Sequence, residues 1–109
     1  MPELAEMRCE QDPGRVFVLE DEEASELLKQ LWQWRLEDDK LVKDFFFQGF
    51  VQGIIFANKA AKAAEQENYS PKFRIEKERV EVTLYTEGAG GIIKNDFIMA
   101  AKIEALAKK

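Results

Sequence analysis

The sequence contains no histidine, the side chain that most often transfers protons and binds metals near neutral pH. A Ser-His-Asp or Cys-His nucleophilic system is therefore excluded, and so is a histidine metal site. The single cysteine, Cys9, excludes both a thiolate zinc cluster and an internal disulfide. We expect no metal site and no bound cofactor, and we expect the chain to be cytoplasmic, where thiols stay reduced.

Long apolar runs and basic stripes are also missing. The longest apolar candidate, residues 45–57, is interrupted by two glutamines and two glycines, whereas a membrane span needs about 18 to 20 apolar residues. The N-terminus has no basic segment followed by an apolar one, so no secretory signal is expected. The net charge is −5 and charges of both signs are interleaved, which leaves no positive surface for phosphates. The sequence predicts neither a membrane protein nor a direct nucleic-acid binder.

The composition that remains is that of a globular domain. Hydrophobic residues make up 46% of the 109 residues and charged residues 34%. A chain of this length buries roughly 65% of its unfolded surface in one core, so we expect a single domain over residues 1–109. Residues 1–19 are mixed in character and contain the turn signal Asp12-Pro13-Gly14, which predicts a mostly irregular N-terminal arm.

Three segments have apolar side chains at helical spacing. The first helix is expected over residues 21–31, with Asp21 as its N-cap and acidic residues in its first turn. The second covers about residues 49–67 and ends just before the next proline, because a residue that precedes proline avoids the α region. The last helix is expected to start at Asn95 or Asp96 and to end in two lysines, whose charge suits a helix C-terminus.

Two hairpins separate these helices. The first joins residues 34–36 to residues 41–47 through an acidic turn, and its second strand places Lys43 among apolar side chains on one face. The second joins residues 73–76 to residues 80–85, again with alternating apolar and polar side chains. The order α-β-β-α-β-β-α predicts an α+β fold, in which a four-stranded antiparallel sheet carries helices packed on one face.

The opposite face of this sheet must be solvated or covered by a partner. Trp34, Phe46 and Tyr85 are candidates for an apolar outer face or edge, which would be typical of an oligomerisation surface. The alternative, that these three aromatic side chains belong to the core, stays open because a single sequence does not fix which way a sheet faces.

The candidate functional groups are carboxylates that lie beside loops. The glycine-rich run at residues 88–91 lacks both nucleotide-binding patterns, so we interpret it as a connection between the last strand and the last helix. A carboxylate acts as a general base when burial raises its pKa, whereas a carboxylate on the surface is ordinarily solvated. Four carboxylates lie next to the predicted loops: Glu65, Glu67, Glu87 and Asp96.

The stretch from residue 64 to residue 106 also carries a linked series of short motifs. In order, these are Ala64-Glu65-Gln66-Glu67-Asn68, Pro71, Val82-Thr83-Leu84-Tyr85-Thr86, Ala89-Gly90-Gly91 and Asn95-Asp96-Phe97-Ile98. The series resembles the pterin-4a-carbinolamine dehydratase family, also known as dimerisation cofactors of a hepatocyte homeodomain factor. The family's element order agrees with the one predicted above, and residues from about 21 to 106 can be laid along it.

The resemblance implies an active site whose histidines bind the pterin and move protons while a 4a-hydroxytetrahydropterin loses water. Tyr69 and Ser70 stand where the family has paired histidines, and Glu87 stands at its third histidine position. A tyrosine or serine ionises far above neutral pH, so neither replaces a histidine directly as a proton carrier. Three positions of the signature keep the family's residues: Glu65, Pro71 and Asp96.

Two functions follow from this pattern. The first, which the loss of the histidines favours, is a non-catalytic protein-binding or assembly factor similar to the dehydratase-like Rubisco assembly factors. The second is an active 4a-hydroxytetrahydrobiopterin dehydratase, a hydro-lyase in which Glu87 acts as acid or base, Tyr69 donates a hydrogen bond and Asp96 orients the pocket. The resemblance assigns the pterin pocket to four further residues: Glu65, Ser70, Pro71 and Thr86.

The resemblance also implies partners. A homodimer or a homotetramer is expected, because the family oligomerises and the predicted sheet has an uncovered face. A protein client or a pterin ligand is the other expected partner, and a third alternative is a flat heterocycle bound without turnover. Nucleic acid and membrane are not expected partners, on the charge and hydropathy arguments given above.

Overall fold

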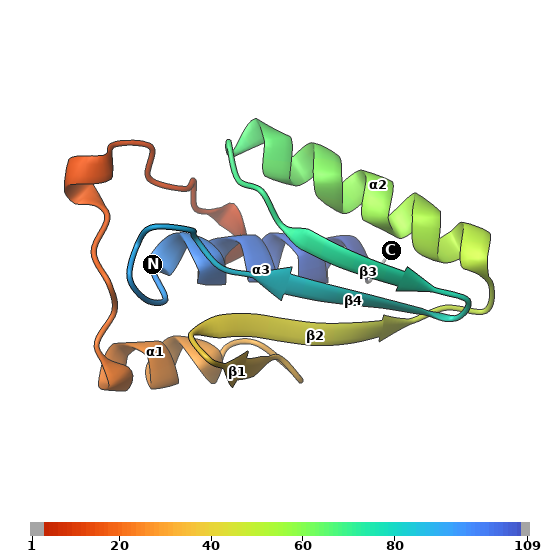
Figure 1. Ribbon diagram of the computed structural model, residues 1–109, viewed down its shortest axis with the longest axis horizontal. Coiled ribbons are helices and arrows are strands. Elements are labelled where there is room, and N and C mark those ends of the chain that lie inside the picture. The colour runs from red at the N-terminus through yellow and green to blue at the C-terminus, as the bar shows by residue number, and fades with distance from the viewer. Residues whose placement is uncertain (1–3, 108–109) are drawn as a thin grey trace.

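The computed structural model describes residues 4–107, where a four-stranded antiparallel sheet in the order β1-β2-β4-β3 carries helices on one face (Figure 1). The helices are α1 (Asp21–Leu28), α2 (Phe50–Gln66) and α3 (Lys94–Ala107), and the strands are β1 (Arg35–Glu37), β2 (Lys40–Phe46), β3 (Lys72–Glu76) and β4 (Arg79–Leu84). This arrangement confirms the predicted α+β fold and the order α-β-β-α-β-β-α. Across residues 4–107, no helix combines the length and the apolar character that a membrane crossing requires.

The first hairpin forms where its sequence predicts it. Asp38 and Asp39 turn the chain with φ angles of 49° and 61°, values that aspartate and asparagine tolerate better than most residues. Side chains then alternate along β2, so that Leu41 and Phe45 are buried while Phe46 is 75% exposed. The period of two therefore assigns the faces of this strand correctly.

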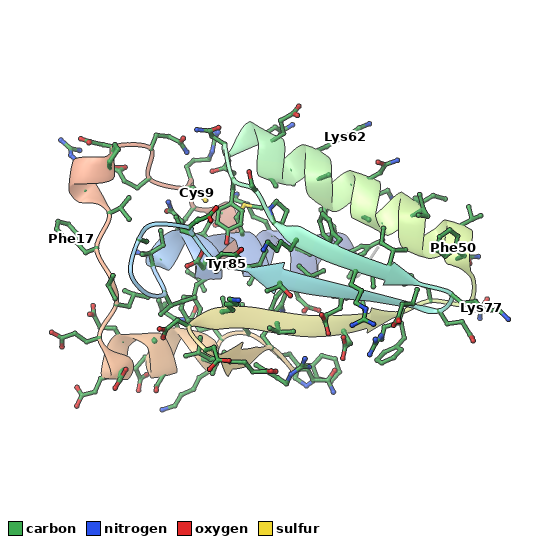
Figure 2. The ribbon with its side chains drawn as sticks, viewed as in Figure 1. Cys9, Phe17, Phe50, Lys62, Lys77 and Tyr85 are labelled. Carbon is green, nitrogen blue, oxygen red and sulfur yellow. The ribbon has the colours of Figure 1, made fainter. Side chains whose placement is uncertain are left out.

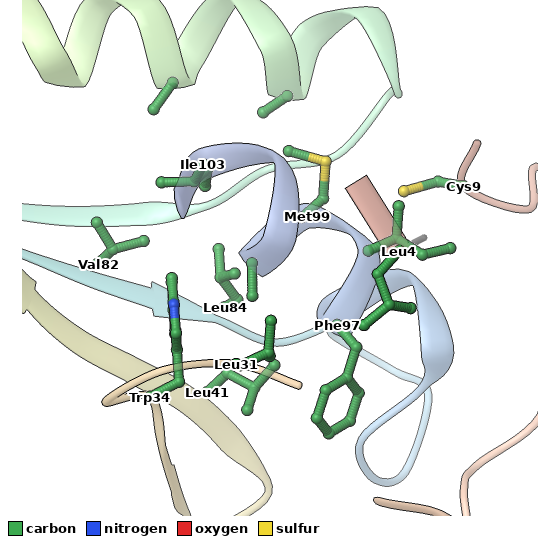
Figure 3. Packing of buried hydrophobic residues seen from close by; sticks show 14 of the residues in the cluster. Leu4, Cys9, Leu31, Trp34, Leu41, Val82, Leu84, Phe97, Met99 and Ile103 are labelled. Carbon is green, nitrogen blue, oxygen red and sulfur yellow. The ribbon is translucent and has the colours of Figure 1, made fainter. Parts of the chain in front are cut away.

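The core lies between the sheet and α3, as Figure 3 shows. Phe97, Met99 and Ile103 of α3 are fully buried, and they pack in one cluster with Val82 and Leu84 of β4. Full burial of an apolar side chain of this size contributes about 1.5 to 3 kcal/mol. The cluster fixes the position of α3 against β4, and with it the loop that joins them.

Of the three aromatic residues that were candidates for the outer face, Trp34 lies in the core, which is the alternative that the sequence left open. Trp34 is only 5% exposed, and its indole N–H donates to Glu104 Oε1 at 2.9 Å. A buried tryptophan needs such an acceptor, and here α3 supplies it. Phe46 is exposed as expected, and Tyr85 is half-buried, with the ammonium groups of Lys40 and Lys72 4.8 and 4.7 Å from its ring centroid.

Two helix starts differ from prediction by one or two residues. Helix α1 has Glu20 as its N-cap, and the Glu20 N–H donates to Glu23 Oε1 at 3.3 Å. It ends at Leu28 and not at residue 31, because the N–H groups of Gln30 and Leu31 donate to the carbonyls of Leu27 and Leu28, three residues back, in a turn. Helix α3 begins at Lys94, because the Asp96 side chain reaches back to accept from the Ile93 N–H at 2.9 Å. Carboxylates in the first helical turn thus set both starts.

The N-terminal arm joins the loop before α3 through a tight contact. Val18 forms an isolated antiparallel bridge with Ile93, and the Leu19 N–H donates to the Ile92 carbonyl at 2.9 Å. At Gly91 a Cβ atom would lie 2.7 Å from Val18 Cγ1, which is too close for two carbon atoms. Glycine is therefore required at this position by the approach of the arm.

Replacing Gly91 by Ala is expected to lower the free energy of unfolding by about 1 to 3 kcal/mol, since the new methyl group overlaps Val18. Urea unfolding monitored by tryptophan fluorescence measures the loss. In the double variant Gly91→Ala/Val18→Ala the overlap is removed, so part of the stability should return. A double variant less stable than the sum of the two single changes would contradict the contact.

Candidate active site around Tyr69 and Asp96

Tyr69 is positioned by the way α2 ends. Asn68 adopts a left-handed conformation with φ of 55°, its N–H donates to the Glu65 carbonyl at 3.1 Å, and the Tyr69 N–H donates to the Ala64 carbonyl at 2.9 Å. This pair of bonds is a Schellman motif, which satisfies the last carbonyls of the helix and turns the chain sharply. Asparagine is one of the few residues other than glycine that enters this conformation readily. The turn brings the Tyr69 side chain against α3.

Asp96 is fully buried and accepts three hydrogen bonds. Its Oδ1 accepts from the Tyr69 hydroxyl at 2.5 Å and from the Thr86 hydroxyl at 2.9 Å, and its Oδ2 accepts from the Ile93 N–H. Burial raises the pKa of Asp96 above its usual range, although the hydrogen bonds from Tyr69, Ile93 and Thr86 oppose that shift. The carboxyl group therefore ties together α3, the segment after β4 and the segment after α2.

The Tyr69 hydroxyl is fixed as a hydrogen-bond donor. Burial and the neighbouring negative charge of Asp96 raise its pKa well above the ordinary value for tyrosine. The hydroxyl consequently stays protonated at any physiological pH, and its proton points to Asp96 Oδ1. Tyr69 can orient a bound ring or bind one of its polar atoms, but it is not a base.

Two cavities meet at this cluster, each of about 410 Å³. The first, here called the arm cavity, is lined by residues from four segments: 10–16 in the arm, 67–69 at the end of α2, 86–89 after β4, and 93–95 at the start of α3. The second, the strand cavity, is lined by residues 68–72 and 85–87. Both are large enough for a bicyclic heterocycle. They share Asn68, Tyr69, Thr86 and Glu87, which form a common wall.

The residues proposed from the sequence fall into three groups around this wall. Tyr69, Thr86 and Asp96 are joined by hydrogen bonds, and Glu87 is exposed where it borders both cavities. Two others line the strand cavity but not the arm cavity: Ser70 and Pro71. Glu65 is exposed on α2 and borders a third hollow of about 350 Å³, which Tyr69 also lines. The structure thus brings together most of the proposed set, and Glu65 stands apart from the hydrogen-bonded cluster.

Two contacts between the N-terminal arm and the site were not predicted, those of Glu67 and Asn95. Glu67 is only 5% exposed and accepts from the Cys9 N–H at 2.6 Å and from Arg8 Nε at 2.5 Å. Burial alone would raise its pKa, but these two donors outweigh burial and hold the pKa of Glu67 below its usual range. Asn95, one of the two residues expected to start the last helix, lies within α3 and binds the backbone of Glu10 through its side chain.

Sequence reasoning recognised Glu67 as a carboxylate near a loop but gave no sign that it is buried. The contact with Cys9 spans 58 residues, and the contact of Asn95 with Glu10 spans 85. Local periodicity reports neither separation, because it describes only one helix or strand at a time. A buried glutamate at a helix C-terminus has no sequence signature of its own.

Comparison with known proteins identifies the family. The family model described as "Pterin 4 alpha carbinolamine dehydratase" matches residues 18–106. A protein of Nitrosomonas eutropha is 37% identical over 95% of this chain and 93% of its own length, and one of Nitrosomonas europaea is 37% identical over 97% and 95%. Both carry the name "Putative pterin-4-alpha-carbinolamine dehydratase".

Two solved structures share the fold. The crystal structure of a transcriptional coactivator/pterin dehydratase from Brucella melitensis superposes with a TM-score of 0.78 and 32% identity, over 83% of this chain and 98% of that one. A pterin dehydratase-like protein identified as a RuBisCO assembly factor in the alpha-carboxysome gives a TM-score of 0.56 and 24% identity, over 71% of this chain and 89% of that one. The second likeness concerns the fold alone. From the family match and the identity to relatives along nearly the whole chain, this protein belongs to the pterin-4-alpha-carbinolamine dehydratase family.

Proposed function

We propose that this chain binds a reduced pterin against the wall shared by the two cavities and removes water from its 4a-carbinolamine. The observation that carries the proposal is the convergence of Tyr69, Thr86 and Glu87 on that wall, around the buried carboxyl group of Asp96. Relatives that are 37% identical along almost the whole chain are named as dehydratases, which supports this activity over a purely structural role.

Each side chain of the wall has a separate role in this proposal. Dehydration breaks the C4a–O bond, transfers the N5 proton and releases the hydroxyl group as water. Glu87 is the one exposed carboxylate on the shared wall, so it accepts the N5 proton and passes a proton to the departing hydroxyl group. Tyr69 and Thr86 orient the ring, and Asp96 positions both hydroxyls without touching either cavity.

The test is stopped-flow dehydration of freshly generated 4a-hydroxytetrahydropterin, with and without the purified protein. Glu87→Gln should lower the acceleration by about 10²-fold, because an amide of the same shape cannot transfer the proton. Glu78→Gln is the matched control, since Glu78 is equally exposed but lies in the turn between β3 and β4, beside Lys77 at the far end of the sheet from Tyr85 (Figure 2). An unchanged rate in Glu87→Gln would remove the proposed role of this residue.

A second candidate function is protein binding without turnover, in an assembly role like the one named for the RuBisCO assembly factor that shares the fold. A group of exposed apolar side chains where β2 gives way to α2 favours it: Phe46, Phe50, Val51 and Ile55. The same surface is the candidate contact for the expected homodimer or homotetramer. A wild-type protein that gives no acceleration in the stopped-flow experiment would favour this second function over the first.

A further inference from the structure

The N-terminal arm forms part of the arm cavity, although the family match begins only at residue 18. Figure 1 shows the arm passing the end of α2 and the start of α3 on its way to α1. Four arm residues line this cavity, and the shared wall forms another of its sides. The four residues are Glu10, Gln11, Pro13 and Val16. A ligand in this cavity would therefore contact the arm as well as Tyr69 and Glu87.

The arm is held at this place by two side chains, Glu67 and Asn95, here called the latch. Glu67 accepts from the Cys9 N–H at 2.6 Å, and the Gln11 side chain donates to the Glu67 carbonyl at 2.8 Å. Asn95 Oδ1 accepts from the Glu10 N–H at 2.8 Å, while its Nδ2 donates to the Glu10 carbonyl at 3.0 Å. Asn95 thus pairs with this backbone as a neighbouring strand would.

Between the latch and Val18, where the arm next contacts the loop before α3, few contacts keep the arm in place. Residues 12–15 are all exposed, and their hydrogen bonds are local to the turn, such as the Gly14 N–H with Asp12 Oδ1 at 2.9 Å. Phe17 is 73% exposed and points away from the molecule in Figure 2. A segment with few buried apolar contacts opens at low free-energy cost, so residues 10–16 are held closed mainly at their two ends, by the latch on one side and by the Val18–Ile93 bridge on the other.

We propose that residues 10–16 are a lid over the arm cavity, held shut by Glu67 and Asn95, and that its opening controls the release of the bound pterin. The identity of the ligand rests on the proposed function, whereas the lid itself does not. With the lid closed, Glu10 and Gln11 line the cavity beside Glu87, so a ring bound there would lose part of its contact with bulk water. Exclusion of water strengthens the polar contacts of a bound ring.

A test of the lid without ligand uses Cys9, the only thiol of the chain. Cys9 is 6% exposed, and burial together with Glu67 raises its pKa to about 12, so a thiol reagent reacts only after the arm opens. Asn95→Ala removes both bonds to Glu10 and should speed the labelling of Cys9 by about tenfold. Lys94→Ala, an exposed neighbour on the same turn of α3, should leave the labelling rate unchanged.

Asn95 lines the cavity, so a second variant separates the latch from direct contact with the ligand. Arg8→Ala removes the 2.5 Å bond to Glu67 from a side chain that does not line the cavity, and it should raise the labelling rate about two- to threefold. The kinetics of unfolding in urea, extrapolated to zero urea, give the global unfolding rate of each variant. This rate must stay below the rate at which Cys9 is labelled. Equal labelling of wild type, Asn95→Ala and Arg8→Ala would overturn the lid.

The ligand experiment then measures release of biopterin by stopped-flow displacement. Asn95→Ala and Arg8→Ala should both speed release, in the same order as they speed labelling, and saturating biopterin should slow the labelling of wild-type Cys9. If both variants release biopterin at the wild-type rate, the lid does not control release. A wild-type protein that binds no biopterin at millimolar concentration would instead count against the proposed function, while the labelling experiment would still decide whether the lid exists.

Discussion

Replacing Glu104 by Ala is expected to lower the free energy of unfolding by about 3 to 5 kcal/mol. Lys43 is 5% exposed on the core face of β2, and its ammonium group lies 2.5 Å from Glu104 Oε1 on α3. Without Glu104 the buried charge keeps only the Trp32 carbonyl at 3.1 Å and the faces of two aromatic rings. The indole N–H of Trp34 loses its acceptor in the same change. Urea unfolding monitored by tryptophan fluorescence measures the effect.

The matched control for this pair removes both charges at once. In Lys43→Met/Glu104→Gln the amide oxygen still accepts from the Trp34 indole, and the methionine fills the volume of the lysine. Replacement of a buried ion pair by groups of similar shape is often neutral or stabilising, so the double variant should be much more stable than Glu104→Ala. A loss below about 1 kcal/mol in Glu104→Ala would mean that water solvates Lys43.

The same pair marks the limit of sequence-based reasoning about the sheet. The period of two along β2 correctly predicted that Lys43 shares a face with Leu41 and Phe45. It could not supply the partner, because Glu104 lies 61 residues further along the chain on α3. Whether Trp34 lies in the core or on the outer face stayed open for the same reason, since the acceptor that allows its burial is also Glu104. Local patterns fix the faces of elements, and long-range pairing fixes what each face can bury.

The candidate site was approached in a different way. That Tyr69, Thr86 and Asp96 belong to one pocket was expected from placing the motifs along a known family, not from periodicity, and the hydrogen bonds that join them are seen only in the structure. The sequence around Glu67 and Asn95 did not indicate their role in the latch. Their partners belong to the N-terminal arm, for which the sequence predicts a mostly irregular structure. An irregular segment can still be ordered by side chains elsewhere, and only the fold reveals which side chains do so.

Replacing Asp96 by Ala is expected to lower the free energy of unfolding by about 2 to 4 kcal/mol, because three donors lose one acceptor. The Ile93 N–H is buried and would have no partner, while the two hydroxyls can reach water in the cavities. Asp96→Asn is the conservative control, since its amide can accept from Ile93 and donate to the hydroxyls of Tyr69 and Thr86. It should cost clearly less than Asp96→Ala in urea unfolding.

The pH dependence of the same comparison tests the buried charge. Burial raises the pKa of Asp96 in the folded chain, so the folded state holds this proton more tightly than the unfolded state. The contribution of Asp96 to stability therefore falls as pH rises from its unfolded pKa of about 3.9 through the folded value. Since the amide in Asp96→Asn does not titrate, any advantage of wild type over this variant should be fully present below the unfolded pKa of about 3.9 and should shrink as pH rises toward neutral. A wild-type advantage that grows with pH would show instead that the hydrogen bonds from Tyr69, Thr86 and Ile93 outweigh burial, leaving a charged Asp96 to orient the wall.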